Sequence, residues 1–359
     1  MRYYTLGNTG LRISRLALGT MTFGPCGGWG TDEQTSRAMF DAYVATGGNF
    51  FDTADAYSDG ESERLLGRFV REAGMRDKAV IATKFTANRG PGDPNAGGNG
   101  RKHILDAVDA SLARLGTGHI DLYILHGWDR LTPPEEVMRT LDDLVRAGKI
   151  RHVGLSNVPA WYAARAQALA ELRGHEPPCS LQLEYSLAER NVEDEFVDLG
   201  TRHGMGIVAW SPLASGLLSG KYRPGPDGAI AGDGRFAGMA DGTPTGKRFD
   251  ARNRAILAAL AAAAAELGRT TAQVALNWVA NRPGVASVLV GATTVAQLED
   301  NLGALDFAIP PELAARLDAA SDREPRFPYL LFRPGVRPLH AGGLAIGDKP
   351  PGYFRRGGE

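Results

Sequence analysis

The amino-acid sequence predicts a single α/β domain, a (β/α)8 TIM barrel, and three observations support this fold class. Short β-branched or apolar runs alternate with longer segments of helical period from residue 11 almost to the end of the chain. Eight strand candidates follow one another without a break in composition, and 359 residues suit one barrel with added loops, which needs about 250 to 400. The residues after the first strand candidate, 19–24, lack the G-x-G-x-x-G fingerprint of an open dinucleotide-binding sheet.

The strand candidates are mostly apolar rather than alternating, as is typical of a parallel sheet that is covered on both faces. They lie at residues 15–18, 49–52, 80–84, 120–125, 152–155, 180–183, 206–210 and 287–290. Helices are predicted between and after them, at 33–46, 62–71, 101–115, 134–147, 159–172, 192–202, 250–267 and 295–302. Extra helices are expected at 271–281 and 310–321.

Four segments fall outside the regular repeat. Residues 3–14 are predicted to form an N-terminal β-hairpin that plugs the lower end of the barrel. Two loops, 90–100 and 221–248, follow strands and should lie on the catalytic face, the second of them over the cofactor. The tail 325–359 is expected near the substrate pocket, to which it would add Phe327, Tyr329 and Phe332.

Composition argues for a small-molecule partner. The chain has 40 basic and 41 acidic residues, so its charge gives no reason to expect binding to nucleic acid or to an anionic membrane. Two cysteines, Cys26 and Cys179, cannot build a disulfide framework, and no secretory signal is visible, so we expect a cytoplasmic protein. The sequence leaves the oligomeric state open.

Four titratable residues are predicted to meet at one rim of the barrel. Asp52 ends the second strand, Tyr57 follows in its loop, Lys84 ends the third strand and His126 follows the fourth. Reactive side chains of such barrels lie at the carboxyl ends of the strands. Each residue alone is ordinary, since a loop tyrosine or a strand-end lysine is usually just solvated. Their joint placement is what indicates a catalytic site.

These residue types suit the reduction of a carbonyl group. The developing alkoxide needs a proton, and an unperturbed tyrosine, with a pKa of about 10, holds its proton too tightly. Lys84 can favour the phenolate of Tyr57, and Asp52 can hold Lys84 in place. His126 can donate a hydrogen bond to the carbonyl oxygen.

Several spaced motifs resemble the aldo-keto reductase superfamily, particularly its bacterial and channel-β-subunit-like branch, over essentially the whole chain. The matching stretches are Phe51-Asp52-Thr53-Ala54-x-x-Tyr57, Thr83-Lys84, Leu125-His126, Gly154-Leu155-Ser156-Asn157, Gln182-x-x-Tyr185-Ser186, Trp210-Ser211-Pro212-Leu213, Gly216-Leu217-Leu218-Ser219-Gly220-Lys221-Tyr222 and Gly291-Ala292-x4-Gln297-Leu298-x-x-Asn301. The resemblance implies that Asp52, Tyr57, Lys84 and His126 form the catalytic tetrad of a reductase, with Tyr57 as the general acid.

A nicotinamide cofactor needs amide partners, a stacking surface and a phosphate site. Ser156, Asn157 and Gln182 can bind the carboxamide, and Trp210 can stack beneath the ring. The loop 211–221 is rich in small residues that let backbone N–H groups approach a pyrophosphate. The full predicted set is Gly19, Thr20, Met21, Asp52, Ser156, Asn157, Gln182, Trp210, Ser211, Pro212, Leu213, Gly216, Leu218, Lys221, Arg235, Gly291, Thr293, Gln297, Asp300 and Asn301.

The form of the cofactor is less sharply indicated. Many relatives place Arg or Lys in the segment matching residues 292–294, to pair with the 2′-phosphate of NADP, and this chain has none there. Arg235 or Arg248 can approach from the other side, so NADP(H) is preferred and NAD(H) is not excluded. The expected substrate pocket consists of Phe23, Trp29, Tyr57, Phe85, His126 and Trp128.

Other chemistries fit less well. Residues 242–248 have the wrong spacing for a P-loop, and the acidic and histidine spacings match neither calcium nor zinc sites, so no metal is expected. A regulatory subunit that binds NADP(H) without turnover is the main alternative to an enzyme. An aldolase that uses Lys84 as a Schiff base is a remoter one.

Overall fold

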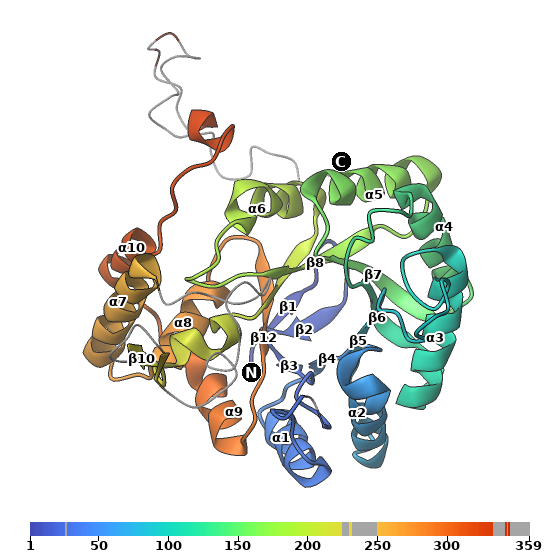
Figure 1. The fold of residues 1–359 in the computed structure, drawn as a ribbon, viewed down its shortest axis with the longest axis horizontal. Helices are drawn as coiled ribbons and strands as arrows, with labels where there is room; N and C mark the ends of the chain where they lie inside the picture. The colour runs from blue at the N-terminus through green and yellow to red at the C-terminus, as the bar shows by residue number, and fades with distance from the viewer. Residues whose placement is uncertain (26, 225–229, 232–249, 333–341, 343, 345–359) are drawn as a thin grey trace.

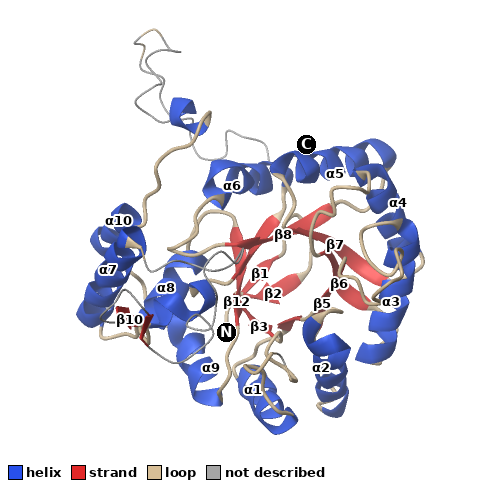
Figure 2. Ribbon diagram, viewed as in Figure 1, coloured by secondary structure: helices blue, strands red, loops and turns tan. Residues whose placement is uncertain are grey.

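A computed structural model describes residues 1–25, 27–224, 230–231, 250–332, 342 and 344. Eight parallel strands form a closed barrel in the order β12-β3-β4-β5-β6-β7-β8-β9, so the predicted (β/α)8 fold is confirmed (Figures 1 and 2). The strands are β3 (Leu16–Gly19), β4 (Phe50–Asp52), β5 (Val80–Phe85), β6 (Ile120–Leu125), β7 (Ile150–Ser156), β8 (Pro178–Glu184), β9 (Gly206–Trp210) and β12 (Val285–Val290).

Helices surround the barrel, as Figure 2 shows. They are α1 (Glu33–Ala45), α2 (Glu61–Glu72), α3 (Arg101–Leu115), α4 (Pro134–Arg146), α5 (Ala160–Arg173), α6 (Val192–His203), α7 (Ala251–Leu267), α8 (Thr271–Ala280), α9 (Val295–Leu302) and α10 (Pro311–Ala320). Local sequence fixes several ends: Asp32 caps α1, a capping box of Thr270 and Gln273 starts α8, and Gly116 ends α3 in the left-handed conformation. Among the described residues no single helix is long and apolar enough to cross a membrane.

The N-terminal hairpin closes the lower end of the barrel, as predicted. Strands β1 (Tyr3–Thr5) and β2 (Arg12–Ser14) pair antiparallel. Leu6 and Ile13 are fully buried and pack in one apolar cluster with side chains that begin the barrel strands, such as Phe50 and Val80. The opposite end, where the strands finish, is therefore the end that is left for a site.

Two predicted coverings of the site lie largely outside the described residues. Most of the loop 221–248 is not described, apart from the short pair β10 (Arg223–Pro224) and β11 (Ile230–Ala231). The described part of the tail runs away from the ring of helices in Figure 1. Phe327 and Phe332 are 79% and 68% exposed, and Tyr329 bonds to Glu195 of α6.

Candidate active site

The Lys84 side chain is the centre of the site. It is fully buried inside the barrel near the carboxyl end of β5. Its ammonium donates hydrogen bonds to Asp52 Oδ2 at 2.6 Å, to the carbonyl oxygen of Thr53 at 2.7 Å and to the hydroxyl of Tyr57 at 3.1 Å. An ammonium has three donors, so these bonds use all of them. The sequence prediction that these side chains meet is thus matched by the geometry.

Asp52 holds this lysine and is itself held. Its carboxylate is 2% exposed, and Oδ1 accepts a hydrogen bond from Gln182 Nε2 at 2.7 Å. The backbone N–H and the hydroxyl of Thr20 both donate to the carbonyl oxygen of Asp52. Burial lowers the pKa of Lys84, but the charge of Asp52 and the hydrogen bond to Tyr57 raise that pKa by more, so it lies above its ordinary value. Lys84 is therefore a protonated cation at neutral pH, which argues against a Schiff-base nucleophile.

His126 stands beside Tyr57 on the rim. The two rings meet edge to face, with centroids 6.0 Å apart and planes inclined by 77°. The backbone N–H of His126 donates to the carbonyl oxygen of Phe85, which fixes the start of its loop to β5. Burial, together with the positive charge of Lys84, lowers the pKa of His126 to about 3. Its imidazole is consequently neutral at pH 7 and has one N–H to donate.

The loop after β4 presents Tyr57 through unusual backbone angles. Ser58 and Asp59 adopt left-handed conformations with φ of 48° and 58°, inside a short 3-10 turn, η1 (Tyr57–Gly60). The backbone N–H of Tyr57 bonds to the carbonyl oxygen of Ala54, and Asp59 pairs with Arg89. Left-handed angles in non-glycine residues cost free energy and are concentrated at functional sites. Here they turn the chain so that Tyr57 faces Lys84.

Asn157 joins the tetrad to the residues predicted for the nicotinamide. Its φ is 51°, and its amide Nδ2 donates to the carbonyl oxygen of His126 at 3.0 Å and to Ser156 Oγ at 2.9 Å. Its Oδ1 accepts a hydrogen bond from Trp210 Nε1 at 3.2 Å. An amide, a hydroxyl and a half-buried aromatic ring therefore stand together beside His126. Ser156 is fully buried in this group, whereas Asn157 is exposed, so Asn157 is its accessible amide.

The segment after β9, which is rich in small residues, is tightly turned. Ser211, Ala214 and Ser215 have left-handed φ angles of 52°, 48° and 58°, and Gly216 has a φ of 94°. Lys221 is exposed at the end of this loop. The other predicted contacts here, Pro212, Leu213 and Leu218, are buried or half-buried. Several backbone N–H groups of this loop, those of Ala214, Ser215, Gly216 and Leu218, donate to oxygens of Ser211 and Leu213 within the loop itself.

The predicted adenosine-phosphate residues lie at and after the end of β12. The side-chain oxygen of Gln297 accepts hydrogen bonds from the N–H and the hydroxyl of Thr293, both at 3.1 Å. Asp300 accepts a hydrogen bond from Thr270 at the start of α8, and Asn301 is 5% exposed. Asp300 thus joins α9 to the start of α8 and Asn301 is buried, whereas Thr293 and Gln297 are exposed.

The remaining predicted cofactor residues differ in accessibility. Gly291 is exposed, and Gly19 and Met21 are half-buried at the end of β3 and just beyond it. Thr20 is fully buried, and its hydroxyl is engaged with Asp52 and with Ser62. Arg235 and Arg248 lie outside the described residues.

Two aromatic residues that the sequence predicted for the substrate pocket are buried in the hydrophobic core of the structure. Phe23 and Phe85 are fully buried and pack between the barrel and the helices, Phe23 against Phe69 and Phe85 against Tyr123 at 4.9 Å between centroids. Side chains alternate along a strand, so with Lys84 inside the barrel its neighbour Phe85 must point outward. Neither phenylalanine lines an open cavity.

Trp29 and Trp128, the two tryptophans predicted for the substrate pocket, are half-buried on loops of the catalytic face. Trp128 packs edge to face on Trp161, with centroids 5.6 Å apart. Trp161 is 55% exposed in the first turn of α5, and sequence reasoning missed it. The sequence feature that could have identified Trp161 is its position four residues after Asn157.

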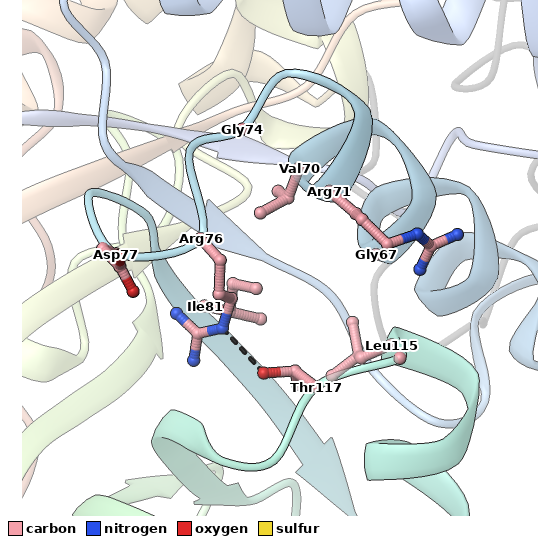
Figure 3. A pocket seen from close by; sticks show the side chains of 10 residues that line it. Gly67, Val70, Arg71, Gly74, Arg76, Asp77, Ile81, Leu115 and Thr117 are labelled. Carbon is pink, nitrogen blue, oxygen red and sulfur yellow. Dashed lines mark hydrogen bonds between the residues drawn. The ribbon is translucent and has the colours of Figure 1, made fainter.

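The hollows between α2 and α3 are a separate feature. One of them has a volume of about 260 Å³. Figure 3 shows the side chains that line it, with the hydrogen bond from Arg76 to Thr117 at the lower end of the barrel. A shallower hollow of about 520 Å³ adjoins it, and three of the arginines that line this hollow form ion pairs: Arg64 with Glu61, Arg68 with Glu33 and Arg114 with Glu63. No residue of the tetrad lines either hollow.

Comparison with known proteins agrees with this geometry. The family model described as "Aldo/keto reductase family" matches residues 15–322. The chain belongs to the aldo/keto reductase family. It is 38% identical to the uncharacterized oxidoreductase YrpG of Bacillus subtilis, over 89% of this chain and 95% of that protein.

Other members of the family carry different descriptions. A probable voltage-gated potassium channel subunit beta of Arabidopsis thaliana is 34% identical, over 91% of this chain and 99% of that protein. An aryl-alcohol dehydrogenase [NADP(+)] of Phanerodontia chrysosporium is 33% identical, over 91% and 87%. The family membership supports an oxidoreductase, and these relatives include both enzymes and channel subunits.

Proposed function

We propose that this aldo/keto reductase reduces an aldehyde or ketone to an alcohol with NADP(H), and that Tyr57 is its general acid. The observation that carries the proposal is the 3.1 Å hydrogen bond from the Lys84 ammonium to the Tyr57 hydroxyl, inside a network closed by Asp52. A cation beside a phenol favours the phenolate, so it makes the phenol a better proton donor.

The hydride that reduces the carbonyl carbon would come from a reduced nicotinamide held by these residues. Tyr57 donates its phenolic proton to the carbonyl oxygen, which becomes the alcohol hydroxyl. The neutral His126 donates its N–H to the same oxygen and orients it. Lys84 keeps its proton throughout, because Asp52 and the carbonyl of Thr53 hold it as a cation.

NADP(H) is the proposed cofactor because a relative over nearly the whole chain is described as using NADP(+). Ser156, Asn157 and Trp210 would hold the nicotinamide. The turned loop that starts at Ser211 would hold the pyrophosphate, and Thr293 would turn its N–H and hydroxyl from Gln297 to the adenosine phosphate. A titration of the protein fluorescence with NADPH and with NADH distinguishes the two cofactors.

The decisive experiment is Tyr57→Phe. We expect this variant to keep the affinity for NADPH and to lose about 10² to 10⁴ in kcat, the usual worth of general acid catalysis. Tyr4→Phe, which removes a hydroxyl from a half-exposed ring on the hairpin at the other end of the barrel, serves as the control and should keep full activity. Unaltered turnover in Tyr57→Phe would remove Tyr57 from the mechanism.

A regulatory subunit is the second candidate, because relatives described as potassium channel subunits match 91% of this chain. NADPH oxidation is to be followed with a broad panel of aldehydes and ketones. Tight NADPH binding with no turnover on any of them would favour this second function over the first.

A further inference from the structure

A second group of polar side chains lies behind the wall of the barrel, between β5 and the helices α2 and α3. Thr83 points outward from β5, whereas its neighbour Lys84 points inward. The hydroxyl of Thr83 donates to Glu63 Oε1 at 2.5 Å, and Arg114 Nε donates to Glu63 Oε2 at 2.5 Å. Glu63 is fully buried, so the charge of this carboxylate is met by one hydroxyl and one guanidinium.

Asp55 lies in the same space and has no such partners. Its side chain is 1% exposed, and neither carboxylate oxygen has a hydrogen-bond partner in the described chain. The hydroxyl of Tyr123, from β6, is buried there without a partner as well. An ionised carboxylate without partners is far more costly to bury than a neutral acid. The geometry therefore favours a protonated Asp55.

The charged groups around Asp55 come from three elements. Burial and the like charge of Glu63 raise the pKa of Asp55 to about 7, and the cations Arg89 and Arg114 oppose this shift without cancelling it. Burial, with the negative charges of Asp55 and Glu63, raises the pKa of Tyr123, so its hydroxyl stays neutral. Asp55 is the one group in this set placed to change its charge near neutral pH.

Asp55 is also in the middle of the loop that carries Tyr57. Its backbone N–H donates to the carbonyl oxygen of Lys84 at 3.2 Å. Two residues earlier, the carbonyl of Thr53 accepts from the Lys84 ammonium, and two residues later Tyr57 bonds to that same ammonium. The loop is thus fastened to one residue of β5 at three successive points.

We propose that Asp55 is a positioning residue that acts as a neutral acid: while protonated it keeps residues 53–57 seated on β5, and its ionisation loosens the contact between Tyr57 and Lys84. The effect on rate rests on the proposed function, whereas the buried proton does not. When the proton leaves to solvent, a charge appears in a buried space beside Glu63, and Arg89, Arg114 and the backbone N–H of Ala56 offset its cost only in part. The loop then moves to hydrate that charge.

The pH profile of kcat tests the link to catalysis. With saturating NADPH and aldehyde, the wild-type protein is expected to lose rate several-fold as pH rises from 6 to 8. Asp55→Asn, a neutral isostere, should keep the pH 6 rate of the wild type and lose less than twofold over the same range. An unchanged loss in Asp55→Asn would overturn the proposal.

A thermal stability series tests the proton without any turnover. Because the folded protein holds this proton to a higher pH than the unfolded chain does, ionisation destabilises the fold progressively from about pH 4 to pH 7. The Tm of Asp55→Asn should therefore rise relative to wild type as pH increases, while Asp306→Asn, at an exposed carboxylate, should run parallel to wild type. Infrared difference spectra should show a protonated carboxyl band at pH 6 that Asp55→Asn lacks.

The outcomes separate the two proposals. Diverging Tm curves with no turnover on any carbonyl would leave the buried proton standing and defeat the proposed reductase. Normal turnover with parallel Tm curves and no carboxyl band would defeat the role of Asp55 and leave the reductase standing.

Discussion

The buried ion pair of Lys84 and Asp52 makes a prediction about stability that does not depend on catalysis. Both side chains are at most 2% exposed, and their charged atoms are 2.6 Å apart. Removing one partner of such a pair leaves a buried charge and costs about 3–5 kcal/mol. Among the described residues, Lys84→Met leaves the Asp52 carboxylate with only the amide of Gln182, so we expect a loss of about 3 kcal/mol in the free energy of unfolding.

The double variant shows whether the loss comes from the unpaired charge. Asp52→Asn should cost a similar amount, but Asp52→Asn combined with Lys84→Met removes both charges and should cost much less than the sum. We expect a coupling energy of about 2 kcal/mol or more, measured by urea unfolding at pH 7 with circular dichroism.

An exposed ion pair of the same kind is the matched control. Lys102 and Asp106 on α3 are 2.7 Å apart, but their side chains are 66% and 64% exposed. Lys102→Met, Asp106→Asn and their combination should change stability by less than about 0.5 kcal/mol and show little coupling. Additive losses at Lys84 and Asp52, or coupling no larger than in the control pair, would refute the reasoning.

Two further predictions concern packing and protonation. A Cβ at Gly67 would lie 2.1 Å from the carbonyl oxygen of Leu115, so Gly67→Ala should push α2 away from α3. We expect this variant to lose about 1–3 kcal/mol in the free energy of unfolding, measured with urea. Gly118→Ala is the control and should be tolerated, because a Cβ there meets nothing within 4 Å. Because its pKa is lowered to about 3, His126 should stay neutral from pH 5 to pH 8. Its imidazole NMR signals, identified by their loss in His126→Gln, should therefore not shift over that range. A titration midpoint near pH 6.5 would contradict this prediction.

Much of the fold was predictable because a parallel barrel repeats one signal. Each strand is an apolar run between turns, and the predicted bounds of β6 and β9 coincide with those of the structure. The bounds of β7 were less predictable, since it begins at Ile150 and continues through the polar Arg151 and His152. Backbone pairing with β6 extends this strand where its side chains give no apolar pattern.

The tetrad was predictable for a related reason. Its members lie at or just after strand ends, and the carboxyl ends of parallel strands share one rim. The ends of three strands in the sequence therefore define one site. The outward direction of the Phe85 side chain could also be predicted, because side chains alternate along a strand and Lys84 points inward. Its aromatic character had instead suggested a pocket wall. The burial of Asp55 could not be predicted from the sequence, because the left-handed residues Ser58 and Asp59 reverse the chain between Asp55 and α2.

The two faces of β5 explain why one loop can be both rigid and responsive to pH. On the inner face, the ammonium of Lys84 donates its three hydrogen bonds to three oxygen acceptors, so its charge is stabilised and does not change with pH near neutrality. On the outer face, Glu63 accepts hydrogen bonds from Thr83 and Arg114, whereas neither carboxylate oxygen of Asp55 has a hydrogen-bond partner among the described residues. A surplus acid in a buried space must keep a proton or disturb its surroundings. Since residues 53–57 cross from one face to the other, the inner network fixes where Tyr57 stands, and the outer network determines up to which pH it stays there.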